Sequence, residues 1–169
     1  IIPLDSEHNS IYRLLELNKN KFKSITITAS GGPFFNKNIN YLKKVTPNQA
    51  IKHPIWKMGK KISVDSATMM NKALEIIEAK YLFDLKNNQI NAIIHPESII
   101  HAAINYYDNS SISLLNEPDM KIPISFLFKL NSNSHRNKNI FQDLNNKKLT
   151  FHKINQNKFP AIRLAYKVL

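Results

Sequence analysis

The sequence predicts an α+β domain in which helices pack on a mixed β-sheet. Two kinds of segment favour this class. Runs rich in β-branched residues occur at 24–30 and again three times between residues 90 and 115, and a long segment of helical periodicity, 65–84, lies between them. The chain has 169 residues, which is enough to bury one hydrophobic core, so we expect a single domain over residues 1–169.

The first third of the chain predicts one strand between two helices. We expect residues 1–4 to end a buried strand and residues 8–17 to form a short amphipathic helix. The alternation in SITITAS predicts a strand at 24–30, and the Gly-Gly-Pro sequence at 31–33 ends it in a turn. Residues 36–61 predict a helix of modest length followed by a loop, because two prolines interrupt them.

The clearest predicted element is a helix over residues 65–84. Its apolar residues recur at i, i+4, i+7 and i+11 and would form one buried stripe: Met70, Leu74, Ile77 and Tyr81. Asp65 or Ser66 can cap the first turn of this helix.

The second half of the chain predicts the rest of the sheet. Strands are expected at 90–96, 98–107 and 111–115, with a hairpin turn at 108–110 between the last two. Beyond them we expect a helix at 122–130, a loop at 131–148 and a helix at 159–169.

The composition excludes several classes of protein. Hydrophobic residues make up 43% of the chain and charged residues 21%, which is typical of a globular domain. The absence of cysteine excludes a disulfide framework and a thiolate metal site. No apolar run approaches the length of a membrane span, and the first residues do not have the pattern of a secretory signal. We therefore expect no membrane partner.

The chain is strongly basic, with 24 Lys and Arg against 12 Asp and Glu and a net charge of +12. Such an excess can serve nucleic acid or a phosphorylated small molecule. Here the lysines are spread along the whole chain, as in LNKNKFK and LNNKKL. This pattern favours a solvated basic surface over a nucleic-acid-binding module, which is kept as an alternative.

Asp5 and Glu7 lie two residues apart at the start of the chain. Two carboxylates this close repel each other unless a cation lies between them. Glu75 of the predicted long helix is a candidate third partner, and three carboxylates without cysteine favour a hard cation such as Mg²⁺ or Mn²⁺. Capping of the next helix would also explain Asp5 and Glu7, and taken singly each acid is better explained by such a structural role.

The long helix also carries a polar face that includes Asn71, Lys72 and Glu75. A phosphate held by Ser66, Asn71 and Lys72 at the helix N-terminus would lie one short molecule away from Glu75. An ordinary solvated face with a Lys–Glu pair explains the same spacing, and spacing alone favours it.

Three further groups of residues carry weaker signals. His95 and His101 are not at a usual metal-ligand spacing, so we interpret them as core residues or as support for a site. Trp56 and Met58 lie in a lysine-rich loop and would form either a lid over a ligand or a local core anchor. The sequence ASGGPF could cradle a phosphate, but two glycines are a weak signal.

Taken together, these segments resemble one known family, the 1-deoxy-D-xylulose 5-phosphate reductoisomerases. The resemblance extends over the whole chain and is most specific in KISVDSATMMNKALE. The other matching stretches are PLDSEHNSI, TASGGPF, HPIWKMGKK, IIHPESIIHAAINYYDNS, PDMKIPI and LTFHKINQNKFPAIRLAY.

The resemblance implies a role for each candidate residue. It implies that Asp5, Glu7 and Glu75 bind a divalent Mg²⁺, Mn²⁺ or Co²⁺ ion, and that Glu7, Glu75 and His53 take part in catalysis. It further implies two sets of substrate contacts. Those at the substrate phosphate are Ser30, Ser66, Asn71 and Lys72. Those at the reacting oxygens or on a mobile flap are Ser6, Glu7, His53, Trp56 and Met58, with Gly59 near the nicotinamide of NADPH.

The resemblance also implies an activity and an assembly. The family rearranges and reduces 1-deoxy-D-xylulose 5-phosphate with NADPH, giving 2-C-methyl-D-erythritol 4-phosphate for isoprenoid synthesis. Its members form homodimers and work in the bacterial cytoplasm or in plastid-type organelles. Relative to the family, residues 1–169 correspond to the catalytic domain, truncated at both ends, so we expect this piece alone to be inactive. A non-catalytic remnant is the remaining alternative.

Overall fold

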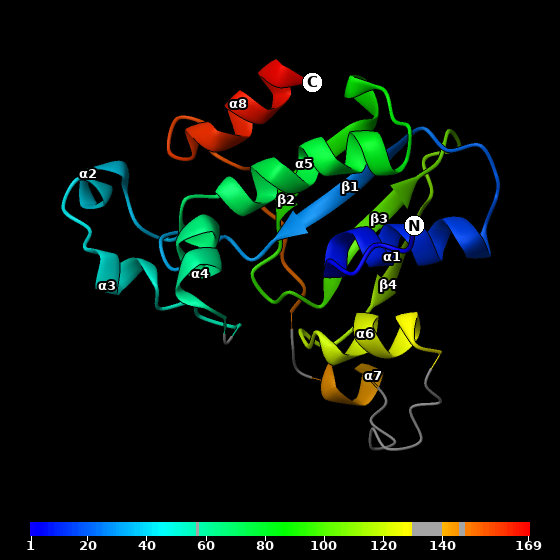
Figure 1. Ribbon diagram of the computed structural model, residues 1–169, viewed down its shortest axis with the longest axis horizontal. Helices are drawn as coiled ribbons and strands as arrows, with labels where there is room; N and C mark the ends of the chain where they lie inside the picture. The colour runs from blue at the N-terminus through cyan, green and yellow to red at the C-terminus, as the bar shows by residue number, and fades with distance from the viewer. Residues whose placement is uncertain (57, 130–139, 146–147) are drawn as a thin grey trace.

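The computed structural model describes residues 1–56, 58–129, 140–145 and 148–169. Within them, one sheet has the strand order β2-β1-β3-β4 (Figure 1). The strands are β1 (Ser24–Ala29), β2 (Ile90–Ile94), β3 (Ile100–Asn105) and β4 (Ser111–Leu115). β1 pairs in parallel with β2 and antiparallel with β3, which in turn pairs antiparallel with β4. The prediction of an α+β fold with a mixed sheet is confirmed.

The helices pack around this sheet. They are α1 (Ser6–Leu17), α2 (Ile39–Leu42), α3 (Pro47–Ala50), α4 (Lys60–Ala67), α5 (Met70–Leu82), α6 (Lys121–Leu127), α7 (Ile140–Asp143) and α8 (Pro160–Val168), with a short 3₁₀ turn, η1 (Asn87–Gln89). α1 and α5 cover one face of the sheet, and α8 packs against α5 (Figure 1). The predicted loop at 131–148 lies largely outside the described residues.

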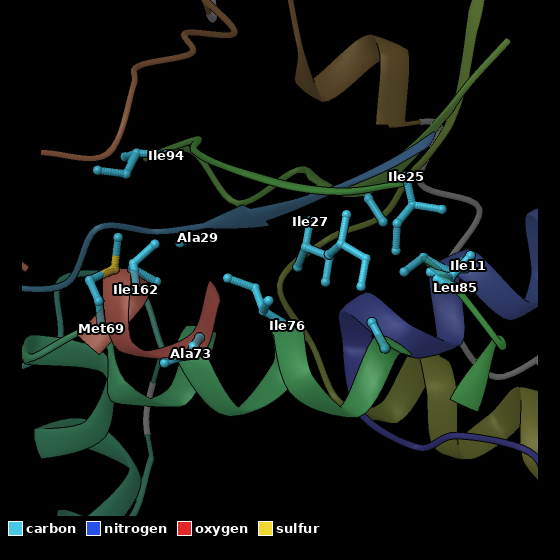
Figure 2. Close-up of a cluster of buried hydrophobic side chains, with 14 of the residues drawn as sticks. Ile11, Ile25, Ile27, Ala29, Met69, Ala73, Ile76, Leu85, Ile94 and Ile162 are labelled. Atoms are coloured by element: carbon cyan, nitrogen blue, oxygen red, sulfur yellow. The ribbon is translucent and has the colours of Figure 1, made fainter. Parts of the chain in front are cut away.

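The hydrophobic core lies between β1 and the two helices that cover it. Ile25 and Ile27 are fully buried and point from the central strand toward α5 and α1, where they meet Ile76 and Ile11 (Figure 2). The period of two in a strand places these isoleucines on one face, so the threonines between them project to the other face. The packing therefore holds α1 and α5 at defined positions over the same end of the molecule.

The predicted helix at 65–84 is wrong in one important respect, because it is two helices. α4 ends at Ala67 and α5 begins at Met70, and Met69 between them has a left-handed backbone with φ of +61°. The Thr68 hydroxyl donates to the Val64 carbonyl and so closes the last turn of α4. Ser66 therefore lies at the C-terminal end of α4 and does not cap α5.

The predicted buried stripe of this helix is also wrong. Met70, Leu74 and Tyr81 are all exposed, and of the four residues only Ile77 is partly buried against the core. The buried face carries Ala73, Ile76 and Ala79, together with Lys72 and Glu75. The small side chains of Ala73 and Ala79, on either side of Ile76, let the helix pack closely on this face, and Met70, Leu74 and Tyr81 are left on the outside.

Two other local predictions fail. Residues 1–4 form no strand, because they have no neighbouring strand to pair with, and only Pro3 among them is buried. Residues 36–61 contain two one-turn helices, α2 and α3, and the first turn of α4, in place of one longer helix. Pro47 does not end a helix but begins α3, where its missing N–H is tolerated.

The remaining predicted elements are confirmed within a few residues. The four strands, α1, α6 and α8 all occur where the sequence places them. Asn109 adopts a left-handed backbone in the predicted hairpin turn, and Asp108 Oδ1 accepts hydrogen bonds from the Ser110 amide and hydroxyl. His95 and His101 are buried, as expected.

Candidate active site

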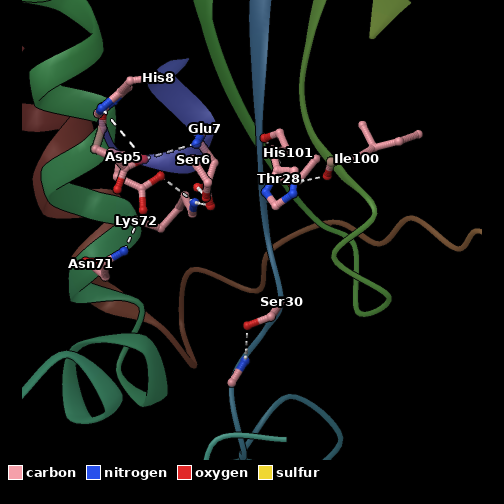
Figure 3. Close-up of polar contacts among 12 residues, drawn as sticks. Asp5, Ser6, Glu7, His8, Thr28, Ser30, Asn71, Lys72, Ile100 and His101 are labelled. Atoms are coloured by element: carbon pink, nitrogen blue, oxygen red, sulfur yellow. Dashed lines mark hydrogen bonds and ion pairs between the residues drawn. The ribbon is translucent and has the colours of Figure 1, made fainter. Parts of the chain in front are cut away.

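Three elements bring polar side chains to one end of the sheet: the first turn of α1, the first two turns of α5 and the end of β1 (Figure 3). Asp5 is the N-cap of α1, and its Oδ1 accepts from the Glu7 amide at 3.1 Å. The capping explanation for Asp5 is thus correct, but it does not exclude a second role. Capping orients one carboxylate oxygen and leaves the other available.

The three predicted metal ligands are brought together by the fold. One carboxylate oxygen from each of Asp5, Glu7 and Glu75 lies within 4.8 Å of the others, and among the described residues no other group of three potential ligands does so. Asn71 Nδ2 donates to Glu75 Oε1 at 2.5 Å and thereby orients it. The helix rise and twist place Asn71 one turn before Glu75, which is why this pair meets.

Lys72 supplies the positive charge inside this cluster. Its side chain is 5% exposed, and its Nζ donates to Glu7 Oε1 at 2.5 Å and also to Glu75 Oε2. The carboxylate of Glu7 also accepts from the Ser6 hydroxyl. A solvated helix face is therefore the wrong interpretation of Lys72 and Glu75, because both side chains are buried against α1.

The ionisation of the cluster follows from burial and crowding. Burial, and then repulsion from Glu7, raises the pKa of Asp5 to about 6. Burial also raises the pKa of Glu75 well above its usual value, and Glu7 adds to the effect. Burial alone would raise the pKa of Glu7, but Lys72 and then His101 outweigh it and hold that pKa near 2. The same carboxylates raise the pKa of Lys72 although burial opposes this.

These residues fit a divalent cation. Oxygen donors in a group of three suit a hard ion such as Mg²⁺ or Mn²⁺. Burial, and then repulsion from Glu7, raises the pKa values of Asp5 and Glu75 although the Lys72 ammonium lowers both. A divalent ion would add the missing positive charge and keep all three ionised.

Ser30 and His53 form a second polar group in the same cavity. His53 Nδ1 accepts from the amides of Ile55 and Trp56 at 3.2 and 2.8 Å. Nε2 therefore carries the hydrogen and donates to Ser30 Oγ at 2.8 Å. Since Ser30 Oγ also accepts from the Gly32 amide, its own hydrogen is left to donate to a ligand oxygen. Burial lowers the pKa of His53, which favours this neutral form.

The glycines of the 31–33 turn bring β1 against α4. Gly31 and Gly32 have φ of +85° and +65°, and a Cβ on Gly32 would lie 2.8 Å from the Ser66 carbonyl oxygen. Only glycine fits both the left-handed backbone and this close approach. The turn thus places Ser66 beside the end of β1, close to where Ser30 lies.

A single cavity of about 230 Å³ joins the two polar groups. Eleven residues predicted for the site line it: Asp5, Ser6, Glu7, Ser30, His53, Trp56, Met58, Ser66, Asn71, Lys72 and Glu75. Gly59, predicted near the nicotinamide, is not among the lining residues and is instead the N-cap of α4. Trp56 meets His101 edge to face, with ring centroids 6.1 Å apart.

Sequence reasoning did not assign a site role to several residues that line the cavity. They are Thr28, Ile62, Met69, Ser98 and Met120, with His101 anticipated only as possible support. Two of them, Met69 and Ser98, have left-handed backbones, with φ of +61° and +52°. Positive φ at a non-glycine residue is set by tertiary packing, so no local sequence signal could have identified them.

Two family models match the chain. The model for the 1-deoxy-D-xylulose 5-phosphate reductoisomerase C-terminal domain matches residues 1–83, and that for the DXP reductoisomerase C-terminal domain matches residues 115–169. Among the described residues, no helix is long and apolar enough to cross a lipid bilayer.

Curated relatives carry the same name. The 1-deoxy-D-xylulose 5-phosphate reductoisomerase of Wolbachia pipientis is 49% identical over 170 residues, which is 100% of this chain and 43% of the relative. The corresponding protein of Ruminiclostridium cellulolyticum is 48% identical over 100% of this chain and 45% of its own length. The chain therefore spans less than half the length of these relatives.

Solved structures agree with the sequence relatives. A DOX-P reductoisomerase in complex with NADPH, fosmidomycin and magnesium superposes with a TM-score of 0.84 at 38% identity, covering 99% of this chain and 44% of the other. The Zymomonas mobilis enzyme in complex with NADPH superposes with a TM-score of 0.80 at 37% identity, covering 98% of this chain and 42% of the other. Sequence and fold agree, and the chain belongs to the 1-deoxy-D-xylulose 5-phosphate reductoisomerase family.

Proposed function

We propose that the chain supplies the metal and substrate sites for the NADPH-dependent conversion of 1-deoxy-D-xylulose 5-phosphate into 2-C-methyl-D-erythritol 4-phosphate, a step of isoprenoid synthesis. One observation carries this proposal. Three clustered carboxylates, of which that of Glu75 is buried, and a set of phosphate-compatible donors line one cavity of a size suited to a small phosphorylated sugar.

The carboxylates form the reacting end of the site. Asp5, Glu7 and Glu75 would hold a divalent ion such as Mg²⁺, Mn²⁺ or Co²⁺, which when bound supplies Lewis-acid stabilisation of an oxyanion. Ser6 and Glu7 lie beside it to contact the substrate oxygens, and Glu7, held ionised by Lys72, can accept a hydrogen bond from a substrate hydroxyl.

The other end of the cavity suits the substrate phosphate. Ser30 has a free hydroxyl hydrogen, and Ser66 lies beside it at the end of β1. Asn71 and Lys72 line the same cavity from the carboxylate side, where both contact Glu75. Anchoring the phosphate there would hold the rest of the substrate against the carboxylates. His53 orients Ser30 directly, so it acts at this end of the site.

The segment containing Trp56 and Met58 would exclude water. Both side chains line the cavity, and the amide of Trp56 is tied to His53 at 2.8 Å. Closing this segment over the ligand would protect an aldehyde from water before its reduction by NADPH. We place Gly59, directly after Met58, near the nicotinamide.

Isothermal titration calorimetry with fosmidomycin tests the proposal, because a relative was crystallised with this compound and magnesium. We expect binding that requires Mn²⁺ or Mg²⁺ and is lost in Glu75→Gln. The variant exchanges one carboxylate oxygen for an amide, so its circular dichroism spectrum should match that of the unmodified chain. No binding of fosmidomycin with either ion present would contradict the proposal. Salt-dependent binding to duplex DNA that is indifferent to these ions would favour the nucleic-acid alternative instead.

We further propose that the chain pairs with a second copy along the β4 edge. β4 has one neighbour in the sheet, β3, and it carries the exposed side chain of Ile112. Ile112→Lys should then yield a monomer in sedimentation velocity, since a charge on the shared edge blocks pairing. A sedimentation coefficient equal to that of the unmodified chain would contradict this arrangement.

A further inference from the structure

Ser98 lies in the turn between β2 and β3 and lines the cavity from the side of the sheet. The residue is 5% exposed, and its backbone is left-handed with φ of +52°. Such a backbone is unfavourable for serine and persists only where the surroundings hold it.

The surroundings of Ser98 do hold it. His95, fully buried, donates from Nδ1 to the Thr150 carbonyl at 2.9 Å and accepts at Nε2 from the Ile99 amide at 3.2 Å. Glu97 accepts from the Thr150 amide and hydroxyl at 3.1 and 2.6 Å. His95 and Glu97, which precede Ser98, are therefore anchored to a distant segment. After Ser98, the Ile99 carbonyl accepts from the Asn116 amide at 2.9 Å, and the Ser98 amide itself donates to the His95 carbonyl at 3.1 Å.

The hydroxyl of Ser98, in contrast, is unused. Its oxygen is buried and has no hydrogen-bond partner within the described part of the chain. Thr28 and Ser30, which line the same cavity, both have partners: Thr28 donates to main-chain carbonyls, and Ser30 accepts from His53 and Gly32. A buried hydroxyl without a partner destabilises a fold, so its presence beside a ligand cavity calls for a partner outside the chain.

We propose that Ser98 is a further substrate-binding residue, whose hydroxyl turns about χ1 into the cavity and donates a hydrogen bond to an oxygen of the bound ligand. This inference rests on the proposed function, which makes that ligand a phosphorylated sugar. Rotation about χ1 between staggered positions needs no movement of the anchored turn. The fixed backbone means that little freedom is lost when the bond forms.

The matched pair Ser98→Ala and Ser24→Ala tests the proposal in the presence of Mn²⁺. Ser24 is also a buried serine, but it lies at the other end of β1, and its hydroxyl accepts from Asn105 Nδ2 at 3.2 Å. We expect Ser98→Ala to weaken fosmidomycin binding about 5- to 10-fold in calorimetry, the loss of one hydrogen bond. Its melting temperature should not fall, because the lost hydroxyl has no partner in the chain.

We expect the opposite result for Ser24→Ala, a lower melting temperature and an affinity within about twofold of that of the unmodified chain. An unchanged affinity in Ser98→Ala, or a drop in its melting temperature equal to that of Ser24→Ala, would overturn the role of Ser98. If the unmodified chain itself does not bind fosmidomycin, the proposed function fails, so the two failures are distinguishable.

Discussion

At the scale of single residues, Lys72 determines the charge of the site. It is buried, contacts two of the three clustered carboxylates and keeps Glu7 ionised. The ammonium lies where it both stabilises the folded chain and competes with a divalent cation for the same oxygens. Its removal should therefore affect stability and metal affinity in opposite directions.

Lys72→Met should lower the free energy of unfolding by about 3 kcal/mol, because it leaves buried carboxylates without their counter-charge. The same variant should bind Mn²⁺ more tightly than the unmodified chain, measured by electron paramagnetic resonance of the free ion. Lys61→Met is the matched control. Lys61 is 85% exposed and pairs with Asp65, whose side chain is 17% exposed, so the loss of Lys61 should cost about 1 kcal/mol or less and leave Mn²⁺ binding unchanged. Weaker Mn²⁺ binding by Lys72→Met would contradict this account.

Glu97 shows how one side chain anchors the turn that carries Ser98. Burial works against its ionised form, but hydrogen bonds from Thr150 outweigh burial and lower the pKa of Glu97. A carboxylate with a lowered pKa stabilises the fold above its unfolded-state pKa, and this stabilisation is lost as the pH falls through the folded-state value.

Glu97→Gln should therefore reduce the free energy of unfolding by about 1 kcal/mol at pH 7. The difference from the unmodified chain should shrink as the pH is lowered below about 4.5, where the unfolded chain takes up the proton. Urea denaturation at several pH values measures both effects. Glu16→Gln, on the exposed side of α1, should show neither effect, and a pH-independent loss in Glu97→Gln would argue against the carboxylate as the cause.

At the scale of secondary structure, the break between α4 and α5 shapes the site. Met69 adopts a left-handed backbone there, buries its side chain and lines the cavity. The break lets α4 turn away, so that Ser66 reaches the end of β1 while α5 continues along the sheet with Lys72 and Glu75 facing inward. In one continuous helix, Ser66 would instead lie in line with α5, one turn before Met70.

Glycine and alanine at position 69 distinguish backbone strain from packing. Both remove the methionine side chain, but only glycine adopts φ of +61° without strain, so Met69→Gly should be about 1 kcal/mol more stable than Met69→Ala. At Leu74, in the interior of α5, the order should reverse, with the glycine variant about 1 kcal/mol less stable. Chemical denaturation of the four variants checks this. If Met69→Ala were as stable as Met69→Gly or more stable, the left-handed backbone of Met69 would not be strained.

At the scale of the whole molecule, the site joins the beginning of the chain to its middle. Asp5 and Glu7 come from the N-cap and first turn of α1, and Glu75 comes from α5, so an ion bound to all three would link two helices on one face of the sheet (Figure 3). His8 adds to this link, because its Nε2 lies 3.0 Å from the Glu75 carbonyl oxygen. Ion binding should thus stabilise the fold as a whole.

Mn²⁺ should raise the free energy of unfolding by about 2.7 kcal/mol when present at 100 times its dissociation constant. The reason is that the unfolded chain does not hold the three carboxylates together. Differential scanning calorimetry with increasing Mn²⁺ measures the effect. Asp5→Asn should retain the helix cap, since asparagine is an equally good N-cap. Its melting temperature should nevertheless rise less with Mn²⁺ than that of the unmodified chain. An equal rise in the melting temperature of this variant would show that Asp5 is not a ligand of the ion.

Sequence alone determined the elements whose pattern is local. The alternation at 24–29, the hairpin turn at Asp108–Ser110 and the helix after Phe159 all depend on neighbouring residues, and all occur as predicted. Eleven residues of the cavity were also identified from sequence, but through resemblance to a family, since spacing alone favoured an ordinary helix face for Lys72 and Glu75.

Tertiary structure decided the features that depend on packing between distant segments. It turned Met70 and Leu74 outward and Lys72 inward, because α5 meets the sheet through its alanines. It also held Met69 and Ser98 in left-handed backbones that no local preference would select. A periodic pattern shows which residues share a face of a helix, but which face is buried depends on what the rest of the chain places against it.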